Sequence, residues 1–477
     1  MTEVLEPETR ETPDVDALIR EARDRQRRRR RRVPAAIVAL ATVGAVAFGI
    51  VQLAGGGAPA VVHDPNGPTV NVRAFAHHGT LAFASHRKLW VLDGKSGSLR
   101  SLTVSGFTPT QPMFSADGEW LAFLQRRPNA AASTLWIARA DGTDAHVVPG
   151  IRVYGLFGWS PSADIVAIST GPISAKRCPC YSPTLVRLVK PDGSVRTLAH
   201  AGDVYGAAWS PDGRRLAVAA MGQFIARLVV YPIAGGAGRM WLVRRAPQRL
   251  NGMQSIVFDT AGWWPHRGIG IWVFGNGAVH NNDNTPLDVI ASPGARPYLL
   301  DETLSDGWTD AIDASITGTL AVVATRDAGR EAWDGKQVEL CGPPCRPLPH
   351  PSGTVTVDPS WSPDGRTLAY AVAPDIKASP WTHKAVAAWF KAHRVVLYDT
   401  VTKRTRMLTA AHGATAVTWS RDGKSLLYVR DDGLWLLPTL ESTPVRIAST
   451  LFPFYSWPQY YAQVNWSGQF AWSSGGG

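Results

Sequence analysis

Residues 361–370 read Trp-Ser-Pro-Asp-Gly-Arg-Thr-Leu-Ala-Tyr, and this motif recurs along the chain. Residues 209–218 (WSPDGRRLAV) match it closely, and residues 419–428 (WSRDGKSLLY) match it less closely. A weaker copy occupies residues 114–123 (FSADGEWLAF), and a degenerate one begins at Trp159. Proline at the second turn position and a glycine that tolerates positive φ suit a tight turn between two strands. Each copy therefore predicts a β-hairpin with apolar residues on both sides of the turn.

The spacing of the copies predicts a ring of repeated sheets. A single hairpin cannot bury its own apolar face, so a repeat of this length indicates a propeller or a β-solenoid. We expect an all-β fold, a β-propeller with eight blades, or seven if a degenerate unit near Phe258 or Ser315 is an insertion. The eight expected hairpins are spaced by about 39 to 58 residues and lie near Phe75, Phe114, Trp159, Trp209, Phe258, Ser315, Trp361 and Trp419.

Each unit also predicts two further short strands and a way to close the ring. Alternating short strands between polar turns are typical of all-β folds. The chain ends with another hairpin fragment, residues 464–472, and we expect its strand to pair across the seam between the first and last blades. The third strands of five units are expected at residues 88–92, 134–138, 184–188, 395–398 and 434–437.

The motif resembles the W-S-P-D-G-x-x-L/I-A-Y/F repeat of TolB-like β-propellers. Residues 209–218 and 361–370 match this pattern most fully, and the resemblance extends over residues 70–477. It implies a propeller. The family includes periplasmic partner-binding proteins, and related propellers precede the hydrolase domain of some peptidases. Because one fold hosts many functions, the resemblance does not choose among them.

The amino-terminal residues predict a membrane anchor. Residues 1–33 hold ten arginines and eight acidic residues, and residues 27–32 are all arginine. Residues 34–54 follow without a charge, and this length can cross a hydrocarbon core of about 30 Å. Arginines on the amino-terminal side predict a cytoplasmic tail (1–33), a single transmembrane signal-anchor helix (34–54), a linker (55–69) and an extracytoplasmic propeller (70–477) in the cell membrane.

Other interpretations of the apolar segment fit less well. Residues 58–60 (Ala-Pro-Ala) suggest a signal-peptide cleavage site, but the apolar run is longer than usual for a cleaved signal. A buried soluble helix is disfavoured by the flanking arginines and by Gly55, Gly56 and Gly57. No cysteine follows the segment directly, so a lipoprotein anchor lacks its nucleophile.

The net charge is +11, of which the first 33 residues supply +2 (ten arginines minus eight acids), leaving +9 for the rest. A basic body favours anionic partners such as acidic polymers or phospholipid head groups. A solvated basic surface without a partner is the alternative. The chain has no helix-turn-helix, zinc-finger or RNA-binding signature, so we expect no nucleic acid as a partner.

The four cysteines all follow the apolar segment, where an oxidising compartment would preserve disulfides. Cys341 and Cys345 flank three residues in a turn expected between the third and fourth strands of one blade, which predicts a bridge. Cys178 and Cys180 are separated by one residue, and a bridge between them would be strained. For this pair both a disulfide and two free thiols remain possible interpretations. Neither pair has the spacing of a zinc site.

No linear motif predicts catalysis. The chain has no G-x-S-x-G elbow, no H-E-x-x-H and no glycine-rich phosphate loop, and its twelve histidines are scattered. We therefore assign no catalytic, cofactor-binding or metal-ligating residue and expect no cofactor. The aspartates of the motif (Asp212, Asp364, Asp422) are expected to cap their own backbone.

The longest departure from the repeat lies between Ala373 and His393 and predicts a helix over residues 383–394. Residues 379–382 suit its start, and its apolar residues recur at helical spacing. It either packs on the neighbouring blade or docks on a partner or membrane surface as a basic amphipathic helix. The residues assigned to the docking role are Trp381, Trp389, Phe390, Lys384 and Lys391.

Two functions are compatible with these observations. The first is a membrane-anchored extracytoplasmic propeller that acts as a non-enzymatic scaffold and binds an envelope protein or anionic polymer. The alternative is a polysaccharide-acting lyase or hydrolase whose residues come from several blades. Histidine, arginine and carboxylates gathered at the mouth of the ring would favour the enzyme, and an apolar mouth would favour binding.

Overall fold

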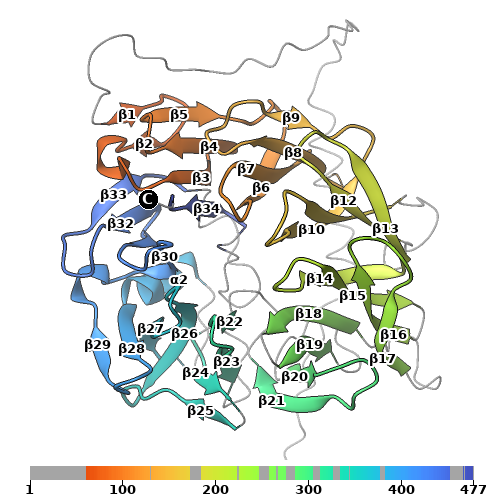
Figure 1. The fold of residues 1–477 in the computed structure, drawn as a ribbon. Helices are drawn as coiled ribbons and strands as arrows, with labels where there is room; N and C mark the ends of the chain where they lie inside the picture. Colours follow the sequence, from red (N-terminus) through yellow and green to blue (C-terminus); the bar gives the residue numbers. More distant parts are fainter. Residues whose placement is uncertain are drawn as a thin grey trace, which may run out of the picture. The chain divides into compact units, whose positions relative to one another are not determined.

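The computed structural model describes residues 61–475 except 129, 131, 172–183, 223–224, 246–256, 265–266, 275–284, 305–311, 326–332, 343, 377–381, 452–465 and 467. These residues form seven antiparallel sheets, of which one has eight strands and comprises two blades, so that eight blades stand around a common centre (Figure 1). The predicted eight-bladed propeller is confirmed. The units near Phe258 and Ser315 are both blades, so the seven-bladed alternative is wrong.

The predicted tail, the transmembrane helix and linker residues 55–60 lie outside the described residues, whereas linker residues 61–69 are described and contribute to two short strands, β1 (Val62–His63) and β2 (Thr69–Val70). Among the residues that the structure does describe, no helix is both long enough and apolar enough to span a bilayer.

Blades 1 to 4 each contain four strands, ordered from the centre of the ring outward. Blade 1 consists of β34 (Phe470–Ser473), β3 (Thr80–Ser85), β4 (Lys88–Asp93) and β5 (Ser98–Ser101). Blade 2 consists of β6 (Thr108–Phe114), β7 (Trp120–Arg126), β8 (Thr134–Arg139) and β9 (His146–Val147). Blade 3 consists of β10 (Val153–Trp159), β11 (Val166–Thr170), β12 (Thr184–Val189) and β13 (Val195–Ala201). Blade 4 consists of β14 (Asp203–Trp209), β15 (Arg215–Gly222), β16 (Ile225–Pro232) and β17 (Arg239–Arg245).

Blades 5 to 8 repeat this order. Blade 5 consists of β18 (Val257–Trp264), β19 (Gly268–Phe274), β20 (Thr285–Ile290) and β21 (Tyr298–Leu304). Blade 6 consists of β22 (Ile312–Ala314), β23 (Leu320–Thr325), β24 (Lys336–Cys341) and β25 (Cys345–Pro347). Blade 7 consists of β26 (Thr354–Trp361), β27 (Thr367–Pro374), β28 (Arg394–Asp399) and β29 (Thr405–Met407). Blade 8 consists of β30 (Thr415–Trp419), β31 (Leu426–Arg430), β32 (Gly433–Leu437) and β33 (Val445–Ala448). The five predicted third strands are β4, β8, β12, β28 and β32.

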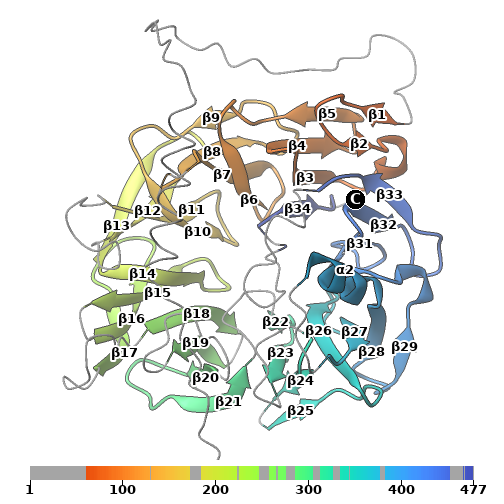
Figure 2. The same cartoon turned by 180° about the vertical axis from the view of Figure 1, so that it is seen from behind.

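The ring is closed from both directions. Strand β34 pairs with β3, from Thr80 opposite Ser473 to Phe83 opposite Phe470, so the carboxy-terminal strand supplies the innermost strand of blade 1 (Figures 1 and 2). The predicted closure is therefore confirmed. The hairpin expected near Phe75 is wrong, because that residue ends a short 3-10 helix, η1 (Arg73–Phe75). On the other side of the seam, β1 (Val62–His63) and β2 (Thr69–Val70) extend the outer edge of blade 8 beyond β33.

The repeated motif folds as a turn because its own side chains satisfy its backbone. In blade 7 the Ser362 hydroxyl donates to Asp364 Oδ1 at 2.6 Å, and that oxygen accepts the Arg366 amide at 3.0 Å. The amide of Gly365 donates to the Ser362 carbonyl at 2.8 Å. These hydrogen bonds favour the ionised carboxylate, and the bond from Ser362 contributes most to lowering the pKa of Asp364. The capping role is thus confirmed, and it recurs at Asp117, Asp212 and Asp422.

The tryptophan that opens the motif joins neighbouring blades. In blade 8 the indole Nε1 of Trp419 donates to the Ser360 carbonyl of blade 7 at 3.1 Å. We call such a bond an indole staple. Each staple satisfies a carbonyl on the innermost strand of the preceding blade, and the ring is buried in blades 3, 7 and 8 and half-buried in blades 4 and 5. Equivalent staples are made by Trp159 to Met113, Trp209 to Gly158, Trp263 to Ala208 and Trp361 to Asp313.

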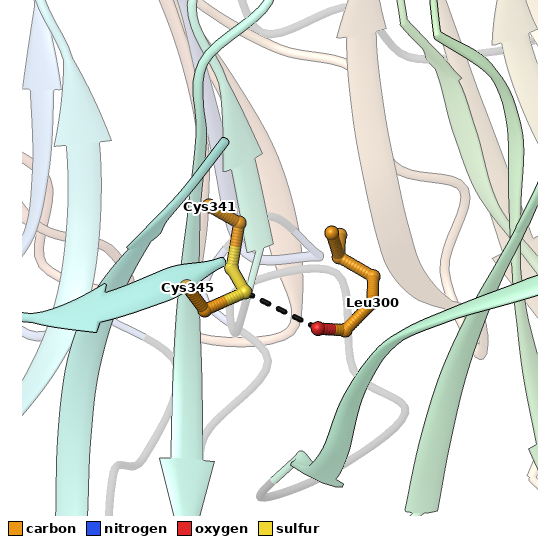
Figure 3. The surroundings of a disulfide bond; sticks show 3 residues. All are labelled: Leu300, Cys341 and Cys345. Carbon is orange, nitrogen blue, oxygen red and sulfur yellow. Dashed lines mark hydrogen bonds between the residues drawn. A yellow bond between two sulfur atoms is a disulfide. The ribbon is translucent and has the colours of Figure 1, made fainter. Parts of the chain in front are cut away.

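Blades 5 and 6 are joined differently. Ala314 occupies the position of the motif tryptophan in blade 6, so this seam has no staple of that kind. Instead, the pairing of Leu304 with Ala324 merges the two blades into one sheet. The predicted disulfide between Cys341 and Cys345 is confirmed, and it joins directly paired residues of β24 and β25 with a Cα–Cα distance of 4.0 Å. Its Cys345 Sγ lies 3.3 Å from the Leu300 carbonyl oxygen of blade 5, a close sulfur–oxygen contact because a bridged sulfur carries no proton (Figure 3).

Candidate functional site

A cavity of about 670 Å³ lies where the innermost strands converge. Its wall is built from the inner strands of blades 1, 2, 3, 6, 7 and 8, near the ends at which those strands enter the motif turns. Most of the lining is apolar. Its large apolar side chains are Phe114, Trp159, Ile312, Trp466, Phe470 and Trp472. A concave site of this volume with aromatic walls is typical of a binding pocket.

β-Bulges shape the wall of this cavity. The pairing register shifts three residues before the motif aromatic in β6, β26 and β30. The residue at each shift, Gln111, Asp358 or Ala416, has a positive φ of 53°, 53° or 52°. A bulge bends the strand and changes where its side chains project. In blade 7 the residue at the bulge is an aspartate that lines the cavity.

Two carboxylates, Asp313 of β22 and Asp358 of β26, lie in this wall. Asp313 accepts the Trp361 amide at 2.6 Å and the Ala314 amide at 2.9 Å. Asp358 accepts the hydroxyl of Thr415. Asp313 thus joins blade 6 to blade 7, and Asp358 joins blade 7 to blade 8. Both residues keep a partly accessible surface.

The surroundings disfavour a charge on either carboxylate. Burial raises the pKa of Asp313 to about 6, although the two backbone amides act in the opposite direction. Burial also raises the pKa of Asp358, opposed by hydrogen bonds from Thr415 and the Ala416 backbone. Neutral donors therefore stabilise the two carboxylates without matching their charge.

The described lining contains no histidine, lysine or arginine. General acid–base catalysis by a histidine and anion binding by a basic side chain therefore have no candidate in this part of the wall. In the described part of the chain, no three His, Cys, Asp or Glu side chains gather as a metal site. The chemistry that the cavity does offer is apolar contact combined with negative charge.

Sequence reasoning did not identify Asp313 and Asp358. They come from different blades, and neither belongs to the motif itself. A local signal was nevertheless present, because Asp358 stands three residues before the motif tryptophan, where blades 2 and 8 carry Gln111 and Ala416. In blade 6, Asp313 stands immediately before the alanine that replaces the motif tryptophan.

The predicted helix is present as α2 (His383–Lys391), capped by the Thr382 hydroxyl, which accepts the Ala385 amide at 3.2 Å. It ends three residues before the predicted Arg394, because Arg394 begins β28. Figure 2 shows α2 against blades 7 and 8, and Lys391 makes an ion pair with Asp431 of blade 8 at 3.7 Å.

The aromatic residues of α2 point inward. Trp389 and Phe390 are 2% and 8% exposed and belong to the core shared by blades 6 and 7. The Trp389 indole donates to the Pro374 carbonyl at 3.0 Å. The Phe390 ring lies 6.5 Å from that of Trp466, so α2 supports the wall of the cavity from behind. These contacts agree with the packing interpretation of the two aromatic residues.

Lys384 and Lys391 are exposed, and a docking role for this face of α2 stays a prediction. Three of the predicted site residues, Trp381, Cys178 and Cys180, lie outside the described residues.

Comparison with known proteins agrees with a propeller of repeated units. The WD40 family model (WD domain, G-beta repeat) matches residues 193–225, which include the motif at Trp209. No curated protein matches the chain in sequence.

Solved structures with similar folds come from proteins of several kinds. A structure of a prolyl endopeptidase is 13% identical over 74% of this chain and 53% of that chain, with a TM-score of 0.46. The β-propeller domain of the Trilobed protease from Pyrococcus furiosus is 9% identical over 74% of this chain and 99% of that domain, with a TM-score of 0.43. An oligogalacturonate lyase in complex with manganese is 14% identical over 78% of this chain and 86% of that chain, with a TM-score of 0.40. The chain spans about half the length of the endopeptidase. At identities this low, the similarity describes the fold and says nothing of activity.

Proposed function

We propose that this protein is a membrane-anchored extracytoplasmic propeller that binds an envelope protein in its central cavity and does not catalyse a reaction. The observation that carries the proposal is the described cavity wall, which is mainly apolar and aromatic and has no histidine or basic side chain. Such a wall buries apolar groups of a ligand and leaves few groups able to transfer a proton. An anionic polymer is the less favoured partner for this cavity, because the charged groups in the described wall are carboxylates.

Partner capture tests the proposal. In Ala116→Trp a bulky ring is added at an exposed position of the cavity lining, so it should obstruct the cavity without disturbing the core. Ala295→Trp is the control, because Ala295 keeps a partly accessible surface and lies between β20 and β21 of blade 5, outside the described lining. Both variants of the full chain are expressed in cells, cross-linked and purified.

We expect an envelope protein to be captured by the wild type and by Ala295→Trp, and its recovery to fall at least about tenfold with Ala116→Trp, since every 1.4 kcal/mol lost is a factor of ten. Equal recovery with both variants would show that the partner binds outside the cavity, and the cavity would then not be the binding site.

The anchor is part of the same proposal and rests on residues 27–32 and 34–54. Protease added to intact cells should digest the propeller and spare a tag placed at the amino terminus. A tag that is digested while the propeller survives would reverse the topology.

The alternative function, hydrolysis or lysis of a polysaccharide, is favoured by one observation. Asp313 and Asp358 both line an aromatic cavity, and glycoside hydrolysis commonly uses two carboxylates. However, burial raises the pKa of both groups, whereas an acid and a base are expected where the surroundings move two pKa values apart. Release of reducing ends from acidic polysaccharides by the wild type, abolished in Asp358→Asn, would support the enzyme in place of the scaffold.

A further inference from the structure

The two cavity carboxylates have no positive partner in the described structure. Neither Asp313 nor Asp358 takes part in an ion pair among the described residues, and their hydrogen-bond donors are amides and a hydroxyl. A carboxylate that is buried without a counter-charge is unfavourable, and a cation brought beside it recovers part of that free energy. The charge pattern therefore favours a positively charged ligand.

The aromatic wall suits the same kind of ligand. The indole N–H groups of Trp159 and Trp472 already donate to the carbonyls of Met113 at 2.9 Å and His78 at 2.7 Å. Their rings are thus held in place, and their remaining surface is carbon. Aromatic faces attract guanidinium and ammonium groups, and more strongly where water is excluded. The cavity combines such rings with two carboxylates, which is the composition expected for a site that binds an organic cation.

The volume indicates how large the ligand is. A lone ammonium or guanidinium group would occupy only a small part of about 670 Å³, whereas pockets of about 300–1,000 Å³ enclose drug-sized ligands. The cavity can therefore also hold groups that flank the cation. The apolar remainder of the wall can bury the residues that flank a basic side chain.

We infer that the central cavity binds a protein segment through a lysine or arginine side chain, with Asp358 and Asp313 as its counter-charges and the aromatic wall around its neighbours. This inference rests on the proposed function and names the chemistry of the partner at the same site.

The test compares two peptides that differ only in charge. Acetyl-Gly-Leu-Arg-Leu-Gly-amide and the same peptide with citrulline in place of arginine are titrated into the full chain in mild detergent by calorimetry. Citrulline keeps the shape and most donors of arginine and lacks the charge. We expect the arginine peptide to bind at least tenfold more tightly than the citrulline peptide.

Asp358→Asn should remove most of this preference. Asparagine is tolerated at positive φ and keeps an oxygen that can accept the Thr415 hydroxyl, so the bulge should persist. Asp431→Asn is the matched control, because Asp431 also has a φ of 53° but is exposed on blade 8 and pairs with Lys391. We expect the affinity for the arginine peptide to fall at least tenfold in Asp358→Asn and to be unchanged in Asp431→Asn.

Three results would overturn the inference: equal affinity for both peptides, no binding of either, or an affinity unchanged by Asp358→Asn. If Asp358→Asn does not fold, Asp313→Asn takes its place with the same expectation. Agmatine serves as a third probe, and binding as tight as that of the arginine peptide would identify a free organic cation as the ligand instead of a protein segment. If both peptides bind equally while Ala116→Trp still abolishes partner capture, the preference for a cation fails and the scaffold stands.

Discussion

The left-handed glycine of the motif turn allows a quantitative test of how neighbouring blades pack. Gly365 has a φ of 67°, as expected, and Gly213 and Gly423 have φ values of 68° and 71°. A Cβ atom added at Gly365 would lie 3.3 Å from Ser315 Cβ and 3.4 Å from side-chain carbons of Ile316 and Thr317. Gly365→Val therefore perturbs both the backbone of its own turn and the contact with the turn of blade 6.

A second glycine separates these two effects. Gly193 also has a positive φ, 81°, but a Cβ atom there would meet nothing within 4 Å. For an L-residue the left-handed conformation costs roughly 1–2 kcal/mol, which is the whole effect expected for Gly193→Val. Crowding against the neighbouring blade adds about 1 kcal/mol, at the low end for overpacking because Ile316 is exposed. Gly365→Val should therefore lower the free energy of unfolding by about 2–3 kcal/mol.

Urea unfolding of the full chain in mild detergent, followed by tryptophan fluorescence, measures both variants. Unchanged midpoints in both would refute the requirement for a left-handed residue in these turns. Equal shifts would keep that requirement and refute the contact between blades. Gly365→Asn is an internal check, because asparagine tolerates this conformation better than valine and should recover part of the loss.

Individual contacts support three further predictions. Trp419→Phe removes an indole staple and leaves the Ser360 carbonyl without its donor. Urea unfolding should therefore show that the free energy of unfolding falls by about 1–3 kcal/mol. A decrease below about 0.5 kcal/mol would show that the staple does not contribute to stability. Burial lowers the pKa of His393 to about 3 in the folded protein, so below pH 6.5 the unfolded chain binds a proton that the folded chain does not bind. Between about pH 6 and pH 4 the free energy of unfolding of the wild type should therefore fall by about 1.4 kcal/mol per pH unit more than that of His393→Leu. Parallel pH profiles of the two proteins would contradict this. Mass spectrometry without reduction should find no free thiol at Cys341 or Cys345, and two free thiols would rule out the bridge. Replacing both cysteines with serine should lower the free energy of unfolding by about 2 kcal/mol, because the loop that the bridge closes is short.

The features that could be predicted from the sequence are those decided within a few residues. Ser362, Asp364 and Gly365 of blade 7 form their turn with one another, so the same three residue types predict the same turn in blades 2, 4 and 8. The period of these turns then predicts the number of blades. The capping of α2 by Thr382 is local in the same way.

The features that could not be predicted depend on contacts between blades. The aromatic at the motif position of blade 5 is Trp263 and not Phe258, which became clear only from the indole staple to Ala208. Asp313 and Asp358 meet at one cavity because the Trp361 amide, three residues after Asp358, reaches the Asp313 carboxylate across a blade boundary. The spacing of Asp313 and Asp358 along the chain does not predict that they line the same cavity.

Closure by β34 has a consequence for the order of events during synthesis. Strand β3 is among the first strands made, yet its inner neighbour comes from the other end of the chain, and the bond from Trp472 to His78 spans 394 residues. At roughly 5–20 residues per second, about 20–80 s pass between the emergence of these two residues. Throughout that interval β3 presents an unpaired edge on which another chain can add. The first blade to be made is therefore the last to be completed, and a product that stops short of β34 should aggregate rather than persist as a slightly shorter propeller.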